Sequence, residues 1–210
     1  MSNEFTIEAT TRSDLGKGAS RRLRRLENRV PGILYGADKT PTPISVLGKD
    51  LTKALENEAF YSHILSLKLD GGDVQVVLKD LQRHPAKNNA THVDFQRIDA
   101  SHKLHMHVPL HFLNEDKCVG VKSGGGIVSH QLTEVEVVCL PKDLPEFIAV
   151  DVADLDMGKS IHLSQLNLPA GVELRALQLG EDHDLSVVSV IATRASIGEE
   201  EAKPAAPAAE

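Results

Sequence analysis

Short segments in which apolar and polar residues alternate constrain the fold of this chain more than any other feature. In the first half they are FTIEATT (5–11), PGILYG (31–36), PISVLG (43–48), HILSLKLDGGDVQVVLKD (63–80) and THVDFQRI (91–98). The fourth contains Asp70-Gly71-Gly72 at a predicted hairpin turn, so the segments predict about six strands. Helical spacing occurs only near residues 20–28 and 49–60. Regular βαβ units need more helices than that, so the pattern favours a small closed β-barrel with two or three short helices.

The second half continues the alternation. Its segments are KLHMHVPLHFLN (103–114), QLTEVEVVCLP (131–141), EFIAVDVADL (146–155), SIHLSQL (160–166), VELRALQL (172–179) and LSVVSVIATR (185–194). Aromatic residues make up only 3% of the chain, so the core must consist of Val, Leu and Ile, which favour strands. We expect a mainly β protein with an antiparallel β domain over residues 99–195. The remaining SIGEEEAKPAAPAAE (196–210) is acidic and rich in Ala and Pro, which predicts a disordered tail.

The charges are divided unevenly between the two halves. Residues 1–97 contain 15 Lys and Arg against 12 Asp and Glu, whereas residues 98–210 contain 8 against 18, and the whole chain has a formal net charge of −7. Such asymmetry indicates two modules. The first, residues 1–98, is suited to a polyanion, and the second would be repelled by one.

The sequence also indicates where the protein is located and in what state its two cysteines are. No apolar stretch is long enough to span a membrane and the N-terminus does not read as an export signal, so we expect a cytoplasmic protein with no membrane partner. Cys118 and Cys139 lie outside any CxxC motif, which favours free buried thiols over a disulfide or a zinc site. Nothing in the sequence predicts a cofactor or a small-molecule substrate.

The stretch GKGASRRLRRLENRVPG (16–32) has five arginines in nine positions. Ser20 is a favourable N-cap residue and Pro31 restricts the residues before it, which predicts a helix from Ser20 to about Asn28. On this helix Leu23 and Leu26 lie about 60° apart and are expected to face the core. Of the arginines, those at 21, 24 and 25 then point away from the core and the one at 22 lies on the flank.

These arginines repel one another on an isolated helix. Within the predicted helix no acidic residue precedes Glu27, and cations in a first turn oppose the helix dipole. A phosphate backbone would relieve this repulsion, because Arg binds phosphate through a planar fork and each contact releases counterions. A solvated charged face is the alternative. GKGAS lacks the Walker spacing GxxxxGK[ST], but a flexible Gly-Lys-Gly segment would let Lys17 approach a phosphate.

A second polar patch is predicted on THVDFQRI, where His92, Asp94 and Gln96 share the face opposite Val93 and Phe95. A carboxylate beside RNA is useful if it accepts a hydrogen bond from a base amine, so Asp94 is a candidate specificity residue. An ion pair at the barrel rim explains it equally well. The segment QRHP (82–85) adds polar side chains at a turn.

Several motifs resemble one known family. GKGASRRLR with an Arg four residues before it, then PGILYG and KDLQRHPAKNNATHVDFQRI, closely resemble the bacterial large-subunit ribosomal protein of the general stress protein Ctc family, which binds 5S rRNA. VGVKSGGGIVSHQLTEVEVVCLPKDLPEFIAVDV and GKSIHLSQLNLPAGVEL look like the second β domain of the family's long form. The resemblance covers about 95 residues of each half.

The resemblance implies a fold, a partner and a set of contacts. It implies a six-stranded barrel that binds an internal loop of 5S rRNA and its flanking helix in the large ribosomal subunit, with neighbouring ribosomal proteins as possible partners of the C-terminal domain. The implied RNA-contacting positions are Arg12, Lys17, Ser20, Arg21, Arg22, Arg24, Tyr35, Lys79, Gln82, His92 and Asp94. Lys79 is a departure, because a member of the family has Gln at this position, and a Lys reads bases less selectively.

Two alternatives remain open. His105, His107 and His111 fall on one face of an expected strand, and two His at i and i+2 can chelate zinc, as a metal-dependent hydrolase would require. The polar face of an amphipathic strand explains them without a metal, and no catalytic nucleophile is apparent. A tRNA-binding barrel is the other alternative, but it would be expected beside a nucleotide-binding catalytic domain, which is absent from the sequence. A non-enzymatic RNA-binding protein is therefore the favoured interpretation.

Overall fold

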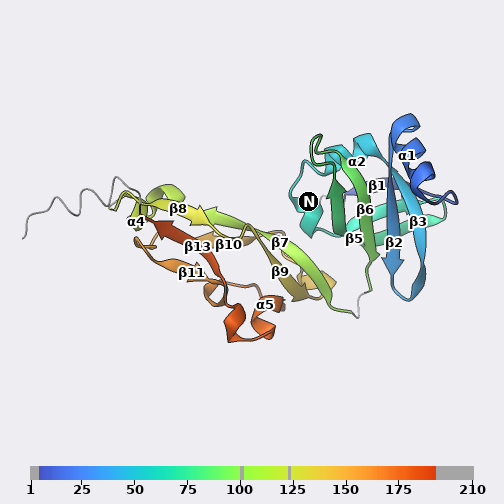
Figure 1. The fold of residues 1–210 in the computed structure, drawn as a ribbon. Helices are drawn as coiled ribbons and strands as arrows, with labels where there is room; N and C mark the ends of the chain where they lie inside the picture. Colours follow the sequence, from blue (N-terminus) through green and yellow to red (C-terminus); the bar gives the residue numbers. More distant parts are fainter. Residues whose placement is uncertain (1–4, 100–101, 123, 193–210) are drawn as a thin grey trace, which may run out of the picture. The chain divides into compact units, whose positions relative to one another are not determined.

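The computed structural model of the 210-residue chain describes residues 5–99, 102–122 and 124–192 (Figure 1). Contacts between Cα atoms divide the chain into two compact units. The first extends to Val108 and also includes residues 137–146 and 170–172, and the second contains the remainder. The predicted tail, residues 196–210, lies outside the described residues. Within the described ranges, no helix is both long and apolar enough to cross a membrane.

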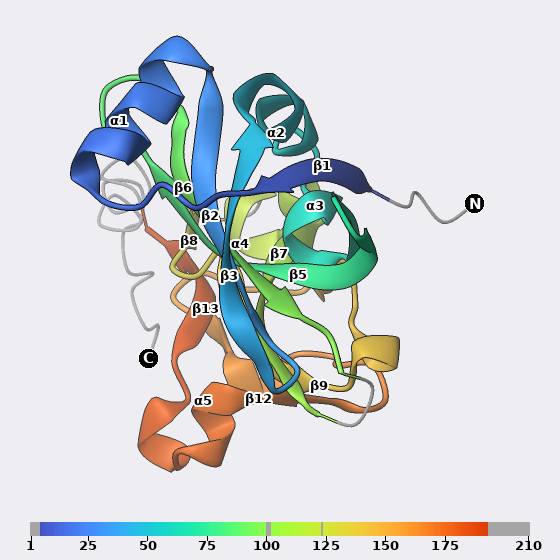
Figure 2. The same cartoon turned by 90° about the vertical axis from the view of Figure 1, so that its right-hand side faces the viewer.

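Six strands of the first unit form a closed barrel in the order β1-β3-β2-β6-β5-β4 (Figures 1 and 2). The pairs β1–β4 and β2–β6 are parallel and the other pairs are antiparallel. The strands are β1 (Thr6–Thr11), β2 (Arg29–Gly36), β3 (Lys39–Leu47), β4 (Leu65–Leu69), β5 (Gly72–Arg83) and β6 (Ala90–Arg97). Three helices accompany them: α1 (Lys17–Leu26), α2 (Gly48–Ala54) and α3 (Ala59–Ser62). The predicted mainly β fold with a six-stranded barrel is confirmed.

The inward side chains of the strands fill the barrel. Phe60 of α3 is fully buried, and its ring meets that of Phe5 edge to face with centroids 5.8 Å apart. Strands β2 and β6 come very close at Gly32, where a Cβ atom would lie 2.6 Å from the carbonyl oxygen of Val93. The remaining buried apolar residues of this core are Ile7, Ala9, Val30, Leu34, Ile44, Val46, Leu51, Leu65, Leu67, Val76, Leu78, Val93 and Phe95.

Helix α1 differs from the prediction in its start and in its buried face. It begins at Lys17, one turn before the expected position, with Gly16 as its N-cap at φ 93°. Leu26, which was expected to face the core, is 77% exposed. The inner face instead consists of the partly buried Ala19, Ser20, Leu23 and Arg24. The projection failed because it assigned the core side from two leucines, whereas this helix lies on the outside of a barrel and packs through only one of them.

The helix expected over residues 49–60 is two helices. Leu51 and Phe60 are both fully buried in the barrel core. On one continuous helix, residues nine positions apart point in opposite directions, so both could not reach the same core. The chain solves this by breaking after Ala54 and restarting at Ala59, whose backbone N–H donates to Oδ1 of Asn57 at 3.1 Å.

The strands beyond the barrel form two sheets, in the orders β10-β7-β9-β12 and β11-β13-β8. The first contains β7 (Leu104–Leu113), β9 (Glu134–Cys139), β10 (Ile148–Asp151) and β12 (Val172–Leu174). The second contains β8 (Ile127–His130), β11 (Ser160–His162) and β13 (Ser186–Ile191). Short helices at α4 (Val119–Lys122) and α5 (Arg175–Gln178) interrupt them.

Two details of this half depart from expectation. Strand β10 pairs with β7 in parallel, so the predicted antiparallel arrangement does not hold throughout. The segment VELRALQL was expected to be one strand, but β12 ends at Leu174 and its polar continuation forms α5. Cys118 and Cys139 are free and buried, as predicted.

Candidate nucleic-acid interface

Among the predicted contact residues, helix α1 places three cations in solvent without a partner in the described part of the chain. Lys17, Arg21 and Arg22 are exposed, and no hydrogen bond or ion pair involving their side chains joins them to the described part of the chain. The first turn contains no acidic residue and the N-cap provides no side-chain hydrogen bond. Nothing in the described protein therefore offsets their repulsion or the helix dipole, which leaves them available to an anion.

Arg12, Ser20 and Arg24 are held by the protein itself. The Arg12 guanidinium donates to Ser20 Oγ at 3.3 Å and to the Asp14 carbonyl oxygen at 3.4 Å, which ties the loop before α1 to the helix. Arg24 donates to the carbonyl oxygen of Thr91 at 2.8 Å, which fastens α1 beside the start of β6. These contacts position the helix, and each guanidinium keeps further N–H groups that a ligand could use.

The outer face of β6 lies between β2 and β5 and is polar. In register, Asp94 is flanked by Ile33 of β2 and Asp80 of β5, and His92 lies opposite Gln82. His92 Nδ1 and Asp94 Oδ1 are 2.6 Å apart, and both side chains are 30% exposed. The contact between these two side chains orients Asp94 on a sheet rather than on a loop, and it is an ion pair whenever His92 is protonated.

Tyr35 borders the same face, with Gln96 as its register partner across β2 and β6. Partial burial raises the pKa of its phenol above the usual value of about 10, and the carboxylates of Asp94 and Asp80 raise it further. The phenol is consequently neutral at physiological pH. It can donate one hydrogen bond and accept others from a polar ligand.

Lys79 and Gln82 both come from β5 but lie in different settings. Lys79 falls where the β5–β6 register shifts between Leu78 and Asp80, and its Nζ donates to the carbonyl oxygen of His105 at 2.7 Å within the first unit. Gln82 is exposed beside His92. Lys79 thus has a protein partner already, which separates it from the free cations of α1.

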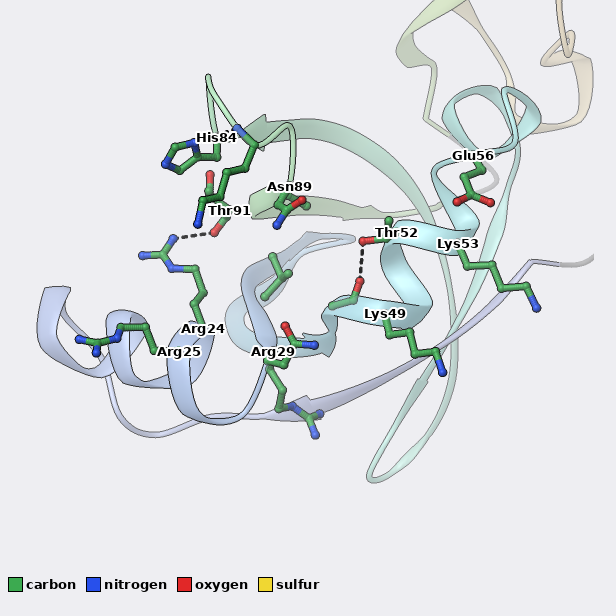
Figure 3. Close-up of a pocket in the computed structure, with 15 residues that line it drawn as sticks. Arg24, Arg25, Arg29, Lys49, Thr52, Lys53, Glu56, His84, Asn89 and Thr91 are labelled. Atoms are coloured by element: carbon green, nitrogen blue, oxygen red, sulfur yellow. Dashed lines mark hydrogen bonds between the residues drawn. The ribbon is translucent and has the colours of Figure 1, made fainter.

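Sequence reasoning passed over several neighbours of these residues. Asp80 joins the polar face only through pairing between β5 and β6, which no local pattern reveals. Arg25 is not among the positions that the resemblance implies, although it is exposed on α1. Lys49 and Lys53 of α2, and Lys87 of the turn between β5 and β6, line the same concavity as Arg25. Figure 3 shows Arg25 on one wall and Lys49 and Lys53 on the other. Their distance in sequence concealed this cluster.

The histidines considered for a metal site lie on β7. His105 and His107 are exposed, and the His111 ring stacks on Phe147 with centroids 4.5 Å apart. Over the described ranges of the chain, no group of three His, Cys, Asp or Glu side chains is placed to hold a metal ion. The hydrolase alternative therefore gains no support from the geometry.

Comparison with known proteins matches both halves of the chain. The Ribosomal L25p family matches residues 7–95, and the family described as Ribosomal protein TL5, C-terminal domain, matches residues 103–194. Large ribosomal subunit protein bL25 of Alcanivorax borkumensis is 62% identical over 190 residues, or 90% of this chain and 89% of that protein. The protein of the same name from Marinobacter nauticus is 57% identical over 90% of each chain. That of Cellvibrio japonicus is 52% identical over 97% of this chain and 100% of its own.

The chain has a closed β-barrel with a basic helix, and a second β-sheet domain of the TL5 type follows it. This combination places it in a class of two-domain ribosomal proteins. Within this class, the chain belongs to the L25p family, that of large ribosomal subunit protein bL25. The resemblance noted from the sequence is confirmed.

Proposed function

We propose that this chain is a structural, non-enzymatic protein of the large ribosomal subunit, located with the ribosome in the cytoplasm, and that its barrel binds an internal loop and a flanking helix of 5S rRNA. The observation that supports this best is the placement of Lys17, Arg21 and Arg22 beside a rigid polar sheet face. The Arg24 contact to Thr91 holds that arrangement, because it joins α1 to the strand that carries His92 and Asp94.

The two surfaces suit different parts of an RNA. The ammonium group of Lys17 and the planar guanidinium groups of Arg21 and Arg22 are not held in place by partners among the described residues. They can therefore adjust to the phosphates of an RNA helix. The face with Tyr35, Gln82, His92 and Asp94 offers both donors and acceptors at fixed positions, which fits base edges. A regular A-form helix keeps its major-groove edges out of reach, so this face requires a non-helical loop whose groove is open.

The second domain has a separate role in this proposal. Residues 98–210 contain 8 basic against 18 acidic residues, so this half does not attract RNA. We assign it to contacts with neighbouring ribosomal proteins. The domain division at residue 98 is part of the same proposal, since the last strand of the barrel ends at Arg97.

A gel-shift titration at one fixed salt concentration tests the proposal. The full chain should bind 5S rRNA more tightly than tRNA or an unrelated RNA duplex by about 10³-fold or more, as specific complexes exceed non-specific ones. Equal affinity for tRNA would favour the tRNA-binding alternative. Equal affinity for all three RNAs would mean that the barrel recognises only charge.

A further inference from the structure

A basic groove lies between α1, α2 and the turn that joins β5 to β6 (Figure 3). Its volume is about 680 Å³, and its lining includes six cationic side chains and a single carboxylate, that of Glu56. The cations are Arg24, Arg25, Arg29, Lys49, Lys53 and Lys87. Only Arg24 belongs to the set assigned above to 5S rRNA.

The floor of this basic groove is fixed by a backbone contact. The N–H of Gly48 donates to the carbonyl oxygen of Asn28 at 2.9 Å, where Asn28 has the left-handed φ of 52° that ends α1. A Cβ atom at position 48 would lie 2.8 Å from that oxygen, so Gly is required there. The first turn of α2 is therefore held against the end of α1, and the two helices form opposite walls.

Four of the six cations have no partner in the described part of the protein. Arg24 donates to Thr91, and Arg29 donates to Thr10 Oγ1 at 2.7 Å and to Ser45. The side chains of Arg25, Lys49, Lys53 and Lys87 are exposed and form no hydrogen bond or ion pair with the residues that the structure describes. Lys49 and Lys53 are four positions apart on α2, so their Cβ atoms lie about 5–6 Å apart on one face.

We propose that the basic groove binds phosphates of a second RNA strand, separate from the 5S rRNA segment that contacts α1 and the sheet face. This rests on the proposed RNA-binding function and extends it to a second strand. Several cations that line one open concavity, four of them without an acidic partner among the described residues, suit an anion whose charges are spread along a chain better than a single small one. A protein that lies between RNA segments can use such a groove to hold two of them together.

The experiment measures binding of a second RNA to a complex already formed. The full chain is saturated with unlabelled 5S rRNA and titrated with a fluorescent oligouridylate of about 12 nucleotides, at several salt concentrations. The variant Lys49→Gln/Lys53→Gln should weaken oligonucleotide binding about 10-fold. It should also lower the slope of log affinity against log salt by about 1.4, since each phosphate that is no longer neutralised accounts for about 0.7. The control Lys68→Gln, on β4 and outside the groove, should change neither value.

Other outcomes would overturn the proposal. They are a complex that binds no oligonucleotide, binding that Lys49→Gln/Lys53→Gln leaves unchanged, equally effective competition by tripolyphosphate at equal phosphate concentration, or tighter binding of a polyglutamate peptide of equal charge. Arg21→Gln/Arg22→Gln separates the two functions, because it should weaken 5S rRNA binding and leave the groove intact. If the chain fails to bind 5S rRNA at all, the same titration on the free protein still tests the groove. Unchanged melting curves verify that the variants are folded.

Discussion

At the scale of single residues, the basic side chains of the barrel differ in how much of their hydrogen-bonding capacity the protein already uses. Arg29 joins three strands through Thr10 and Ser45, and Arg97, only 9% exposed, donates to Thr42 Oγ1 at 3.0 Å. Arg21 and Arg22 make no such bonds with the described residues. Arginines of the same charge therefore have different roles. Substitution of Arg29 or Arg97 should lower stability, whereas substitution of Arg21 or Arg22 should weaken RNA binding.

Arg21→Gln and Arg22→Gln should each weaken 5S rRNA binding and lower the salt slope by about 0.9 for each phosphate that is no longer neutralised, with the melting temperature unchanged. The measurement is affinity against log salt for 5S rRNA and for an RNA with an altered loop. Both RNAs should bind more weakly by similar factors, because phosphates carry no sequence. Arg29→Gln is the opposite case, and it should reduce the free energy of unfolding by about 1–3 kcal/mol. An unchanged salt slope for both α1 variants would mean that Arg21 and Arg22 do not bind phosphates.

Asp94→Asn should act on selectivity. It replaces an acceptor-only carboxylate on the sheet face, so the preference for the native loop over an altered loop should fall by about 1–3 kcal/mol while the salt slope stays nearly constant. The contact with His92 is only partly buried, so its loss should cost at most about 1 kcal/mol of stability. Full loop preference in the folded Asn variant would leave Asp94 as a structural partner of His92 alone.

The two thiols should be unreactive in the folded protein. Cys118 and Cys139 are each about 1% exposed or less, and burial, with Asp143 as a smaller cause, raises the pKa of the Cys139 thiol. A raised pKa leaves less thiolate at pH 8, so alkylation should be slow in buffer and rapid for both residues in denaturant. Mass spectrometry after timed alkylation measures this, and rapid labelling of the native protein would show that the structure around the labelled thiol opens readily.

At the scale of elements, the parallel pairing of β2 with β6 joins the N-terminal strands of the barrel to its last strand. Residues Gly32 to Tyr35 pair in parallel with Val93 to Gln96, so the strand after α1 meets the last strand of the first half. That pairing depends on the missing side chain of Gly32. The same pairing places Tyr35 beside the polar face. One strand pairing therefore determines both the close packing at Gly32 and the position of Tyr35 on the surface.

Gly32→Ala should destabilise the barrel by about 1–3 kcal/mol, because the new methyl group would overlap the Val93 backbone. Gly71→Ala is the matched control. It lies in the β4–β5 turn with no atom within 4 Å of a built Cβ, and should leave stability nearly unchanged. Chemical denaturation of both variants gives the comparison. Equal stability of the two would mean that β2 and β6 can separate without cost.

At the scale of the whole molecule, charge and fold are divided in the same way. The half with the closed barrel carries the excess of basic residues, and the half with the two open sheets carries the excess of acidic ones. Residues 1–98 should therefore bind 5S rRNA alone, and residues 99–210 should not bind it. Gel shifts with the two fragments, after circular dichroism confirms their fold, measure this. Comparable affinity of the second fragment would contradict the division.

The sequence predicted those features that depend on local pattern. Alternation located the barrel strands, and Asp70-Gly71-Gly72 located the hairpin between β4 and β5. It could not identify the buried face of α1, because the partners of Leu23 and Arg24 come from distant strands. The parallel pairing of β10 with β7 and the groove around Lys49 and Lys53 were missed for the same reason. Both depend on contacts between residues far apart in the chain.

Closure of the barrel has a further consequence for how the protein behaves at high concentration. Each of its six strands has a partner on both sides, since β1 pairs with both β3 and β4. No row of unpaired backbone groups in the described barrel is then offered to a second molecule, which is the usual route to intermolecular sheet growth. The sheets of the other half do have edges, but their outermost strands β8, β10, β11 and β12 are only three or four residues long. Newly made chains awaiting assembly should accordingly resist aggregation.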